Sequence, residues 1–176
     1  MKKTRSEYVR YTKTIARYME QWLKKQINLA SHLDSFELKR LSIDWSTKRR
    51  CSRGGWYKSV SGPGISIAMH TTCKSTNGQV LRWYEYSSFD NNPVIGGFYY
   101  TDPCYALQGI VAHEMAHAAQ YHCYYTTNQK RDKPHGKLFK YYYQALREEF
   151  VNPIIENQDI LLEQRNKNIQ DIKRAA

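Results

Sequence analysis

The chain has 176 residues, of which 41% are hydrophobic, and it carries a formal net charge of +11. This length suits one compact domain with one hydrophobic core, so we predict a single domain over residues 1–176. The sequence contains no run of about 18 apolar residues, as a membrane span needs, and its charged N-terminus does not resemble a secretion signal. We expect a monomer in the cytoplasm or associated with the nucleoid, not secreted and without a membrane partner.

Residues 5–30 are predicted to form an amphipathic helix. Apolar residues recur every three or four positions and should face the core: Tyr8, Tyr11, Ile15, Tyr18, Trp22 and Leu29. Basic residues with the same spacing should face solvent: Arg10, Lys13, Arg17 and Lys24. Residues 1–60 hold fifteen Lys or Arg but five Asp or Glu, so almost all of the excess positive charge is N-terminal.

A second basic cluster follows this helix and alternates with aromatic residues. Its basic members are Lys48, Arg49, Arg50 and Arg53, and its aromatic members are Trp45, Trp56 and Tyr57. Concentrated positive charge is typical of nucleic-acid-binding proteins, and aromatic rings can stack on unpaired bases. We therefore predict single-stranded or damaged DNA as a partner of the N-terminal region. Two alternatives stay open: a solvated helix face for the first cluster, and the packed side of a strand for the aromatic residues.

The middle of the chain predicts strands. A short helix or turn at 34–41 should precede strands at about 41–48 and 64–69. A hairpin should follow, with strands at about 80–87 and 94–100 joined by a turn rich in Asp and Asn. Its aromatic residues would either line a substrate cleft or only pack against the domain: Tyr84, Tyr86, Phe98, Tyr99 and Tyr100.

A long helix is predicted from Pro103 to about Tyr121, because Asp102 suits the N-cap and proline suits the first helical position. One side of this helix should be apolar: Leu107, Ile110, Val111, Met115 and Ala118. The other side should carry His113, Glu114, His117 and Tyr121, and should face a cleft.

Within this helix, residues 113–117 read His-Glu-Met-Ala-His. Histidines four positions apart lie on one helical face, with about 5–6 Å between their Cβ atoms, so both rings can reach one zinc ion. Glu114 stands beside them, where it can take a proton from a water molecule that the metal activates. This pattern is typical of metal-dependent peptide hydrolases.

A catalytic zinc usually has three protein ligands, so a third ligand must come from elsewhere. His122 points about 140° away from His117 around the helix, and we expect it to be a surface or partly buried residue. His135 is the better candidate because it precedes a helix predicted at 137–150, which a polar connection allows to fold back antiparallel. A downstream glutamate, Glu148 or Glu149, is the alternative ligand.

The last predicted helix covers residues 154–174. Its apolar residues recur seven apart, and we expect the helix to dock on the domain rather than to pair with another chain. With helices at both ends and short strands between them, the predicted layout is α+β.

The order of the His-Glu-x-x-His motif, a polar loop and then Pro134-His135-Gly136-x-x-Phe139 resembles the SprT-like zinc metalloprotease family, which includes the Spartan proteases. Several upstream segments resemble the strands before that family's motif helix: Trp45-Ser46, Cys51, Gly54-Gly55 and Ile65-Ser66-Ile67. The resemblance covers about residues 40–152 and implies a zincin-like metalloprotease domain. In such a domain a small antiparallel or mixed sheet packs with the motif helix, and N-terminal and C-terminal helices flank it. Two features depart from the family, because residues 71–102 look longer than usual and the cysteine pairs of a zinc ribbon are missing.

The resemblance also implies a function. His113, His117 and His135 would bind one catalytic Zn²⁺, and Glu114 would be the catalytic base of an endopeptidase. Several family members act on DNA-bound proteins. The strand Ile65–Met69 would hold the substrate polypeptide as an added strand. An oxyanion donor is also expected, and the sequence does not choose among Tyr121, Tyr124 and Tyr125.

Two other functions stay open. A nucleic-acid-binding protein could hold a structural or vestigial zinc, although no cysteine lies at ligand spacing to His113. A metalloprotease without any DNA partner could use its basic N-terminus for solubility only.

Overall fold

Helices and short strands make up the structure, a computed structural model that describes residues 3–25, 33, 35–46, 51–72, 79–86, 89, 91–128 and 130–157. The helices are α1 (Arg5–Lys25), α2 (Met69–Thr72), α3 (Pro103–Thr127) and α4 (Lys137–Leu146), and α4 continues into a π-helical turn at Arg147–Val151. The strands are β1 (Arg40–Asp44), β2 (Arg53–Tyr57), β3 (Gly62–Ala68), β4 (Leu81–Trp83) and β5 (Phe98–Tyr100), with a 3-10 turn at Lys58–Val60. This mixture of helices with two small sheets agrees with the predicted α+β layout.

The central strand of the first sheet is β3, which lies between β1 and β2. It pairs in parallel with β1 and antiparallel with β2, so Ile65 lies opposite Leu41 on one side and Gly54 on the other. The expected substrate strand at Ile65–Met69 is therefore wrong, because the backbone groups of β3 already bond to both neighbouring strands. Among the described residues, β1 and β2 are the two edge strands of this sheet, and β2 is the edge strand that packs on α3.

Local sequence rules do not predict β2, because two adjacent glycines are typical of a turn and are depleted in strands. Only the resemblance to the SprT-like family places Gly54-Gly55 among the strand segments. The structure explains the first of these glycines. A Cβ atom added to Gly54 would lie 1.9 Å from the carbonyl oxygen of Glu114. Only a residue without a side chain allows the strand to approach the helix backbone this closely. Gly54 thus places the backbone of β2 directly beside the predicted metal motif.

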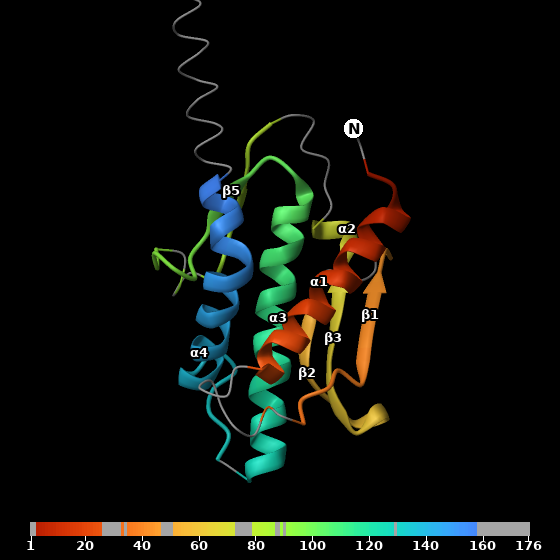
Figure 1. The fold of residues 1–176 in the computed structure, drawn as a ribbon, viewed down its shortest axis with the longest axis vertical. Helices are drawn as coiled ribbons and strands as arrows, with labels where there is room; N and C mark the ends of the chain where they lie inside the picture. Colours follow the sequence, from red (N-terminus) through yellow and green to blue (C-terminus); the bar gives the residue numbers. More distant parts are fainter. Residues whose placement is uncertain are drawn as a thin grey trace, which may run out of the picture.

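The long helix α3 runs through the centre of the molecule, with the three-stranded sheet on one side, α4 on the other and α1 crossing it (Figure 1). Its start is as predicted, since the Asp102 carboxylate accepts a hydrogen bond from the N–H of Cys104 at 2.8 Å. The predicted division into two sides is confirmed in part: Leu107, Val111, Met115 and Ala118 lie in the core, and His113 and Glu114 line a cleft. Ile110 lines that cleft as well, and the polar residues Gln108 and Gln120 are buried, which the division does not predict.

Helix α1 packs against α3 through a line of residues that differs in part from the prediction. The buried residues are Thr12, Ala16, Met19, Glu20 and Leu23. Tyr8, Tyr11, Ile15 and Trp22 are half-buried against the core, as expected. Tyr18 is 57% exposed, so its predicted core position is wrong. Thr12 and Ala16 are buried, and Tyr18 lies about 200° around the helix from Ala16, so it faces solvent. Leu29 lies outside the described residues.

The predicted hairpin is present as β4 and β5, but its ladder is shorter than expected. Leu81, Arg82 and Trp83 pair antiparallel with Tyr100, Tyr99 and Phe98, respectively. The chain leaves the ladder soon after Trp83 because the Glu85 side chain contacts His113 on α3 instead. The hairpin is therefore anchored to the motif helix by a side chain rather than extended as a regular sheet.

The C-terminal part of the chain is described up to residue 157. Residues 152–157 are helical and follow the π-helical turn directly, whereas residues 158–174 of the predicted last helix lie outside the described part. Within the described ranges, no helix combines the length and the apolar character that crossing a membrane requires.

Candidate metal centre

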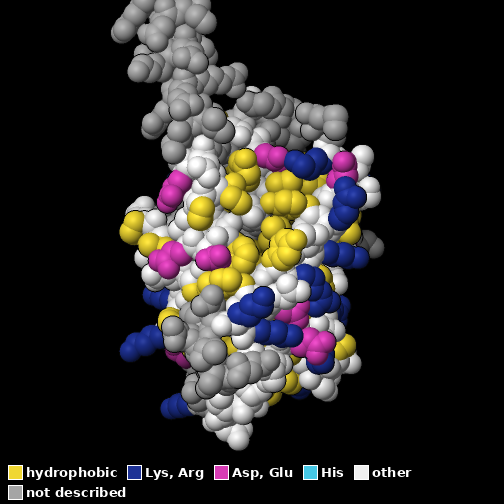
Figure 2. Space-filling model, in the orientation of Figure 1, with side chains coloured by type: hydrophobic (Ala, Val, Ile, Leu, Met, Phe, Trp, Pro, Cys, Tyr) yellow, Lys and Arg dark blue, Asp and Glu magenta, His cyan; other side chains and the backbone are white. Residues whose placement is uncertain are grey.

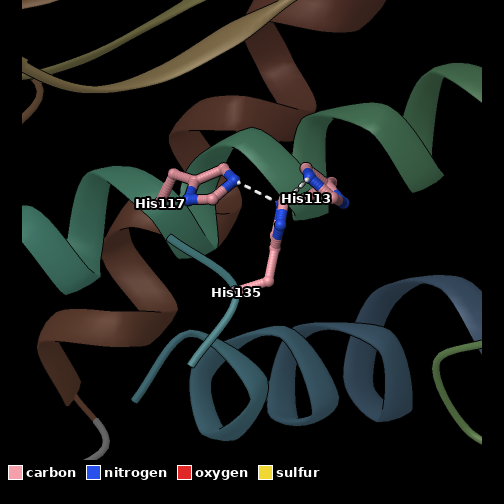
Figure 3. A group of neighbouring side chains, drawn as sticks. All are labelled: His113, His117 and His135. Atoms are coloured by element: carbon pink, nitrogen blue, oxygen red, sulfur yellow. Dashed lines mark hydrogen bonds between the residues drawn. The ribbon is translucent and has the colours of Figure 1, made fainter. Parts of the chain in front are cut away.

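Side chains from α3 and from the loop before α4 meet at one point. His113 and His117 extend from successive turns of α3, and His135 reaches them from the opposite side (Figure 3). The Nε2 atom of His135 lies 3.0 Å from Nε2 of His117 and 3.4 Å from Nε2 of His113. One ligand atom from each ring lies within 4.8 Å of the other two. These are the three histidines that the sequence singles out, and together they could hold a metal ion.

The spacing and the protonation state of these rings suit a zinc ion. Nitrogen ligands about 2.0–2.1 Å from a tetrahedral zinc are roughly 3.3 Å apart, close to the shorter distances observed here. Burial, together with the neighbouring His113 and His135, lowers the pKa of His117 to about 3. Burial and His113 also lower the pKa of His135. Both rings are therefore neutral near pH 7, which is the form that binds a metal.

Aromatic rings surround the three imidazoles. Phe139, the last residue of the Pro-His-Gly-x-x-Phe pattern, is fully buried. Its ring centroid lies 5.0, 4.4 and 4.8 Å from those of His113, His117 and His135, respectively. Tyr86 lies 4.2 Å from the His135 ring and stacks at 5.5 Å on His113. These contacts restrict the orientation of the ligands and limit the access of water.

Hydrogen bonds hold the loop that presents the third histidine. The side chain of buried Gln120 on α3 donates to the carbonyl oxygen of Lys133 at 3.1 Å and to the Tyr124 hydroxyl at 3.0 Å. The N–H of Asp132 donates to the same hydroxyl at 3.0 Å. The Asp132 carboxylate accepts a bond from the first N–H of α4 at 2.7 Å. The loop is thus fixed to both helices, which positions the imidazole that it carries.

Glu114 is buried where β2 meets α3. The backbone N–H of Gly54 donates a hydrogen bond to its carboxylate. Burial raises the pKa of Glu114 to about 7, against the opposing effects of His113 and of this hydrogen bond. A carboxyl group with a pKa near neutrality can both accept and return a proton at physiological pH.

The sequence does not single out Glu85, yet its carboxylate is the neighbour of His113 on the side away from the other rings. Oε1 of Glu85 lies 3.3 Å from Nδ1 of His113, and Oε2 accepts a hydrogen bond from the Tyr143 hydroxyl at 2.5 Å. The guanidinium of buried Arg147 donates to the same hydroxyl at 3.1 Å. Burial alone would raise the pKa of Glu85, but the bonds from His113 and Tyr143 outweigh it, and the pKa is lowered. The only signal in the sequence is an acidic residue within an aromatic strand.

Replacing Glu85 with glutamine is expected to weaken zinc binding about 10- to 100-fold, because a carboxylate beside Nδ1 orients the imidazole and increases its basicity. The affinity is measured by competition with a chromophoric chelator. Glu148→Gln serves as the control, since the Glu148 carboxylate is exposed and accepts only from Gln144 in the described contacts. Equal affinities in both variants would show that the contact between Glu85 and His113 has no influence on the metal.

The tyrosines considered as oxyanion donors lie further along α3. The Tyr124 hydroxyl takes part in the hydrogen bonds of the loop. Tyr125 stacks on Trp56 with ring centroids 4.3 Å apart. Tyr121 lies against β2, where a Cβ atom on Gly55 would be 3.4 Å from its ring. The tyrosines whose rings contact the imidazoles are instead Tyr86, which the sequence places in the hairpin, and Tyr143 on α4.

Of the basic residues predicted on the first helix, Arg10 and Lys13 are exposed and Lys24 is half-buried. Arg17 forms an ion pair with buried Glu20 at 2.6 Å. Figure 2 shows Lys and Arg side chains gathered along α1 on this face of the molecule. The helix therefore presents the basic surface that its sequence predicts, with one of its four charges partly neutralised.

Only part of the second basic cluster is described. Arg53 is exposed at the start of β2, whereas Lys48, Arg49 and Arg50 lie outside the described residues. Trp56 stacks on Tyr125, and the Arg40 guanidinium lies 4.7 Å from the ring centroid of Tyr57. Trp56 and Tyr57 therefore belong to a strand and pack against neighbouring side chains, which agrees with the alternative prediction that these aromatic residues form the packed side of a strand.

Two further expectations change with the structure. His122 is buried rather than at the surface, with its ring 5.4 Å from that of Phe36, because α3 is covered on this side too. Glu148 and Glu149 are exposed on the π-helical turn, and the histidine group forms without them. A glutamate as the third ligand is therefore wrong, since the direction of α4 carries both side chains away from the imidazoles.

Comparison with protein families gives a match to the SprT-like family over residues 15–159. Searches among curated proteins and among solved structures found no match. The matched region begins within α1 and ends beyond the π-helical turn, so it is wider than the resemblance that the motifs indicate. It covers most of the chain and includes Glu114 and all three converging histidines, and the chain therefore belongs to the SprT-like family.

Proposed function

We propose that the protein is a zinc-dependent endopeptidase in which His113, His117 and His135 hold the metal and Glu114 is the catalytic base. The observation that carries this proposal is the buried Glu114 carboxyl group next to three converging imidazoles. The SprT-like family is associated with metallopeptidase-like activity, which supports the same reaction. A purely structural zinc would usually have four protein ligands, whereas three imidazoles leave one position for water.

When bound, a zinc ion supplies Lewis acidity towards water and towards the carbonyl group of the substrate. The protein's own groups handle the protons. Glu114 takes a proton from the attacking water and returns it to the leaving amine, while the N–H of Gly54 keeps the carboxylate in place. Glu85 and Phe139 hold the imidazoles in the orientation that the reaction needs.

Removal of the metal tests this function directly. Treatment with a zinc chelator is expected to abolish the cleavage of an unfolded protein substrate, and added Zn²⁺ should restore it, whereas Mg²⁺ should not because it prefers oxygen ligands. Cleavage is followed on gels together with the zinc content of the protein. Full activity in a preparation that holds far less than one zinc per chain would contradict the proposal.

We further propose that the basic N-terminal region binds DNA and brings the endopeptidase to DNA-associated proteins. Exposed Arg10 and Lys13 on α1 support this, as does exposed Arg53. Arg53 directly precedes Gly54, which contacts Glu114, so one basic residue lies close to the candidate centre.

Single-stranded DNA is accordingly expected to stimulate proteolysis at low salt and to lose this effect as salt increases. The logarithm of the DNA affinity should fall with the logarithm of the salt concentration by about 0.7 per phosphate contact. Proteolysis is measured with and without DNA across a salt series, alongside direct binding to labelled DNA. If the protein did not bind DNA and DNA did not stimulate proteolysis at any salt concentration, the proposed DNA partner would be rejected and the protease would act without DNA.

A further inference from the structure

A cleft of about 910 Å³ opens beside the three imidazoles. One wall is the N-terminal half of α3, from Ala106 through Ile110 to His113 and Glu114, which corresponds to roughly 12 Å of helix. The opposite wall is the ribbon of β4 and β5, and residues 51–52 before β2 also line the cleft. The cleft therefore leads away from the candidate centre along the helix, where a substrate residue next to the cleaved bond would extend.

The ribbon wall is unusually rich in exposed aromatic side chains. Tyr99 in β5 is more than half exposed, and so are Tyr84 and Tyr86, which follow β4. Leu81 and Trp83 from the same ribbon line the cleft as well. Neighbouring apolar side chains left in solvent mark a surface that is covered by a ligand or partner. Here the exposed rings stand at the entrance to the proposed active site.

Apart from the proposed base Glu114, the charged groups on the cleft are already engaged within the protein. The Glu85 carboxylate contacts His113 and accepts a bond from Tyr143. The Arg82 guanidinium lies over the rings of Tyr84 and Tyr99, 4.9 and 5.9 Å from their centroids. The cleft thus offers flat ring faces and aliphatic groups, which favour an apolar guest over an anionic one.

From these features we infer that the cleft between α3 and the β4–β5 ribbon is a specificity subsite for an aromatic or large aliphatic side chain of the substrate. This inference rests on the proposed function and adds to it a substrate class: polypeptide segments with such a residue beside the cleaved bond. Covering a side chain of this size should favour it over alanine by about 10- to 100-fold. Folded proteins bury these residues, so unfolded or loosened segments would be the preferred substrates.

Binding is tested with the Glu114→Gln variant, so that peptides are not cleaved. Fluorescein-labelled decapeptides that differ only in one central residue, Phe, Leu, Ala or Asp, are titrated and followed by fluorescence anisotropy. The Phe and Leu peptides should bind about 10- to 100-fold more tightly than the Ala peptide, and the Asp peptide least tightly. Equal affinities, or the highest affinity for Asp, would overturn the subsite.

Two variants locate the effect. Ile110→Trp fills the cleft and should bring the ratio of the Phe and Ala affinities close to one, whereas Tyr18→Trp adds the same side chain on exposed α1 and should leave the ratio unchanged. Tyr84→Ala removes part of the wall from an exposed position and should lower the ratio without affecting folding. A ratio that both Ile110→Trp and Tyr84→Ala retain would place the binding elsewhere.

Cleavage of the same peptides by the unmodified protein separates this inference from the proposed function. Peptides that bind selectively but are never cut would leave the subsite in place and reject the endopeptidase. Peptides that are cut at equal rates, with equal affinities, would retain the endopeptidase and reject the subsite.

Discussion

Replacing Glu114 with glutamine is expected to reduce peptide hydrolysis at least about 10³-fold, because the amide cannot take a proton from the attacking water. The zinc content should not change, since the amide has nearly the same shape and the three imidazoles are untouched. Initial rates on an unfolded protein substrate and metal analysis of the same preparation measure the two effects. A loss of activity at unchanged zinc content would show that Glu114 acts in the reaction and not in holding the metal.

The control is Glu149→Gln, the same chemical change at an exposed glutamate of the π-helical turn. It should leave both the rate and the zinc content unchanged. A Glu114→Gln protein that binds zinc and still cleaves at the normal rate would show that another group is the base. A variant that loses zinc would instead show that Glu114 mainly supports the ligands.

Gly54→Ala is expected to destabilise the protein by several kcal/mol, of the order of 3 kcal/mol or more. The new Cβ atom would collide with the backbone of Glu114, whose carbonyl oxygen would be only 1.9 Å away. A helix backbone in the middle of the core cannot move as a flexible side chain can, so β2 must separate from α3. Chemical denaturation, followed by the fluorescence of the tryptophans, measures the loss.

The neighbouring substitution Gly55→Ala provides the comparison. Its Cβ atom would meet only the Tyr121 ring at 3.4 Å, although its φ of 154° is one that L residues rarely adopt. The expected loss is therefore smaller, about 1–2 kcal/mol. If Gly54→Ala were as stable as the unmodified protein, the close packing of β2 on the motif helix would be incorrect.

Local sequence rules were sufficient for the elements that carry the metal ligands. The spacing of His113 and His117 requires only the helical repeat, and the helix start follows from the capping residue Asp102. The predicted helix after His135 begins where expected, at Lys137. In each case the deciding interaction lies within a few residues along the chain, so the sequence contains it directly.

Contacts between distant residues decided the rest. By local rules the Gly-Gly pair of β2 is typical of a turn. It forms a strand here because Gly54 packs against the backbone of Glu114, which lies sixty positions later in the sequence. Tyr18 follows the apolar spacing of its helix and yet faces solvent, because packing on α3 selects another line of residues.

By itself, the sequence determined His113, His117, the adjacent glutamate and the helix that carries the motif, because these depend on a local repeat, and it identified His135 through its place before the next helix and the resemblance to the SprT-like family. Only the tertiary structure decided that β2 is the edge strand beside Glu114, that Glu85 contacts His113 and that the β4–β5 ribbon forms one wall of a cleft. The physical reason is that such contacts join residues with no fixed separation along the chain, and the packing of the whole core selects which of them meet.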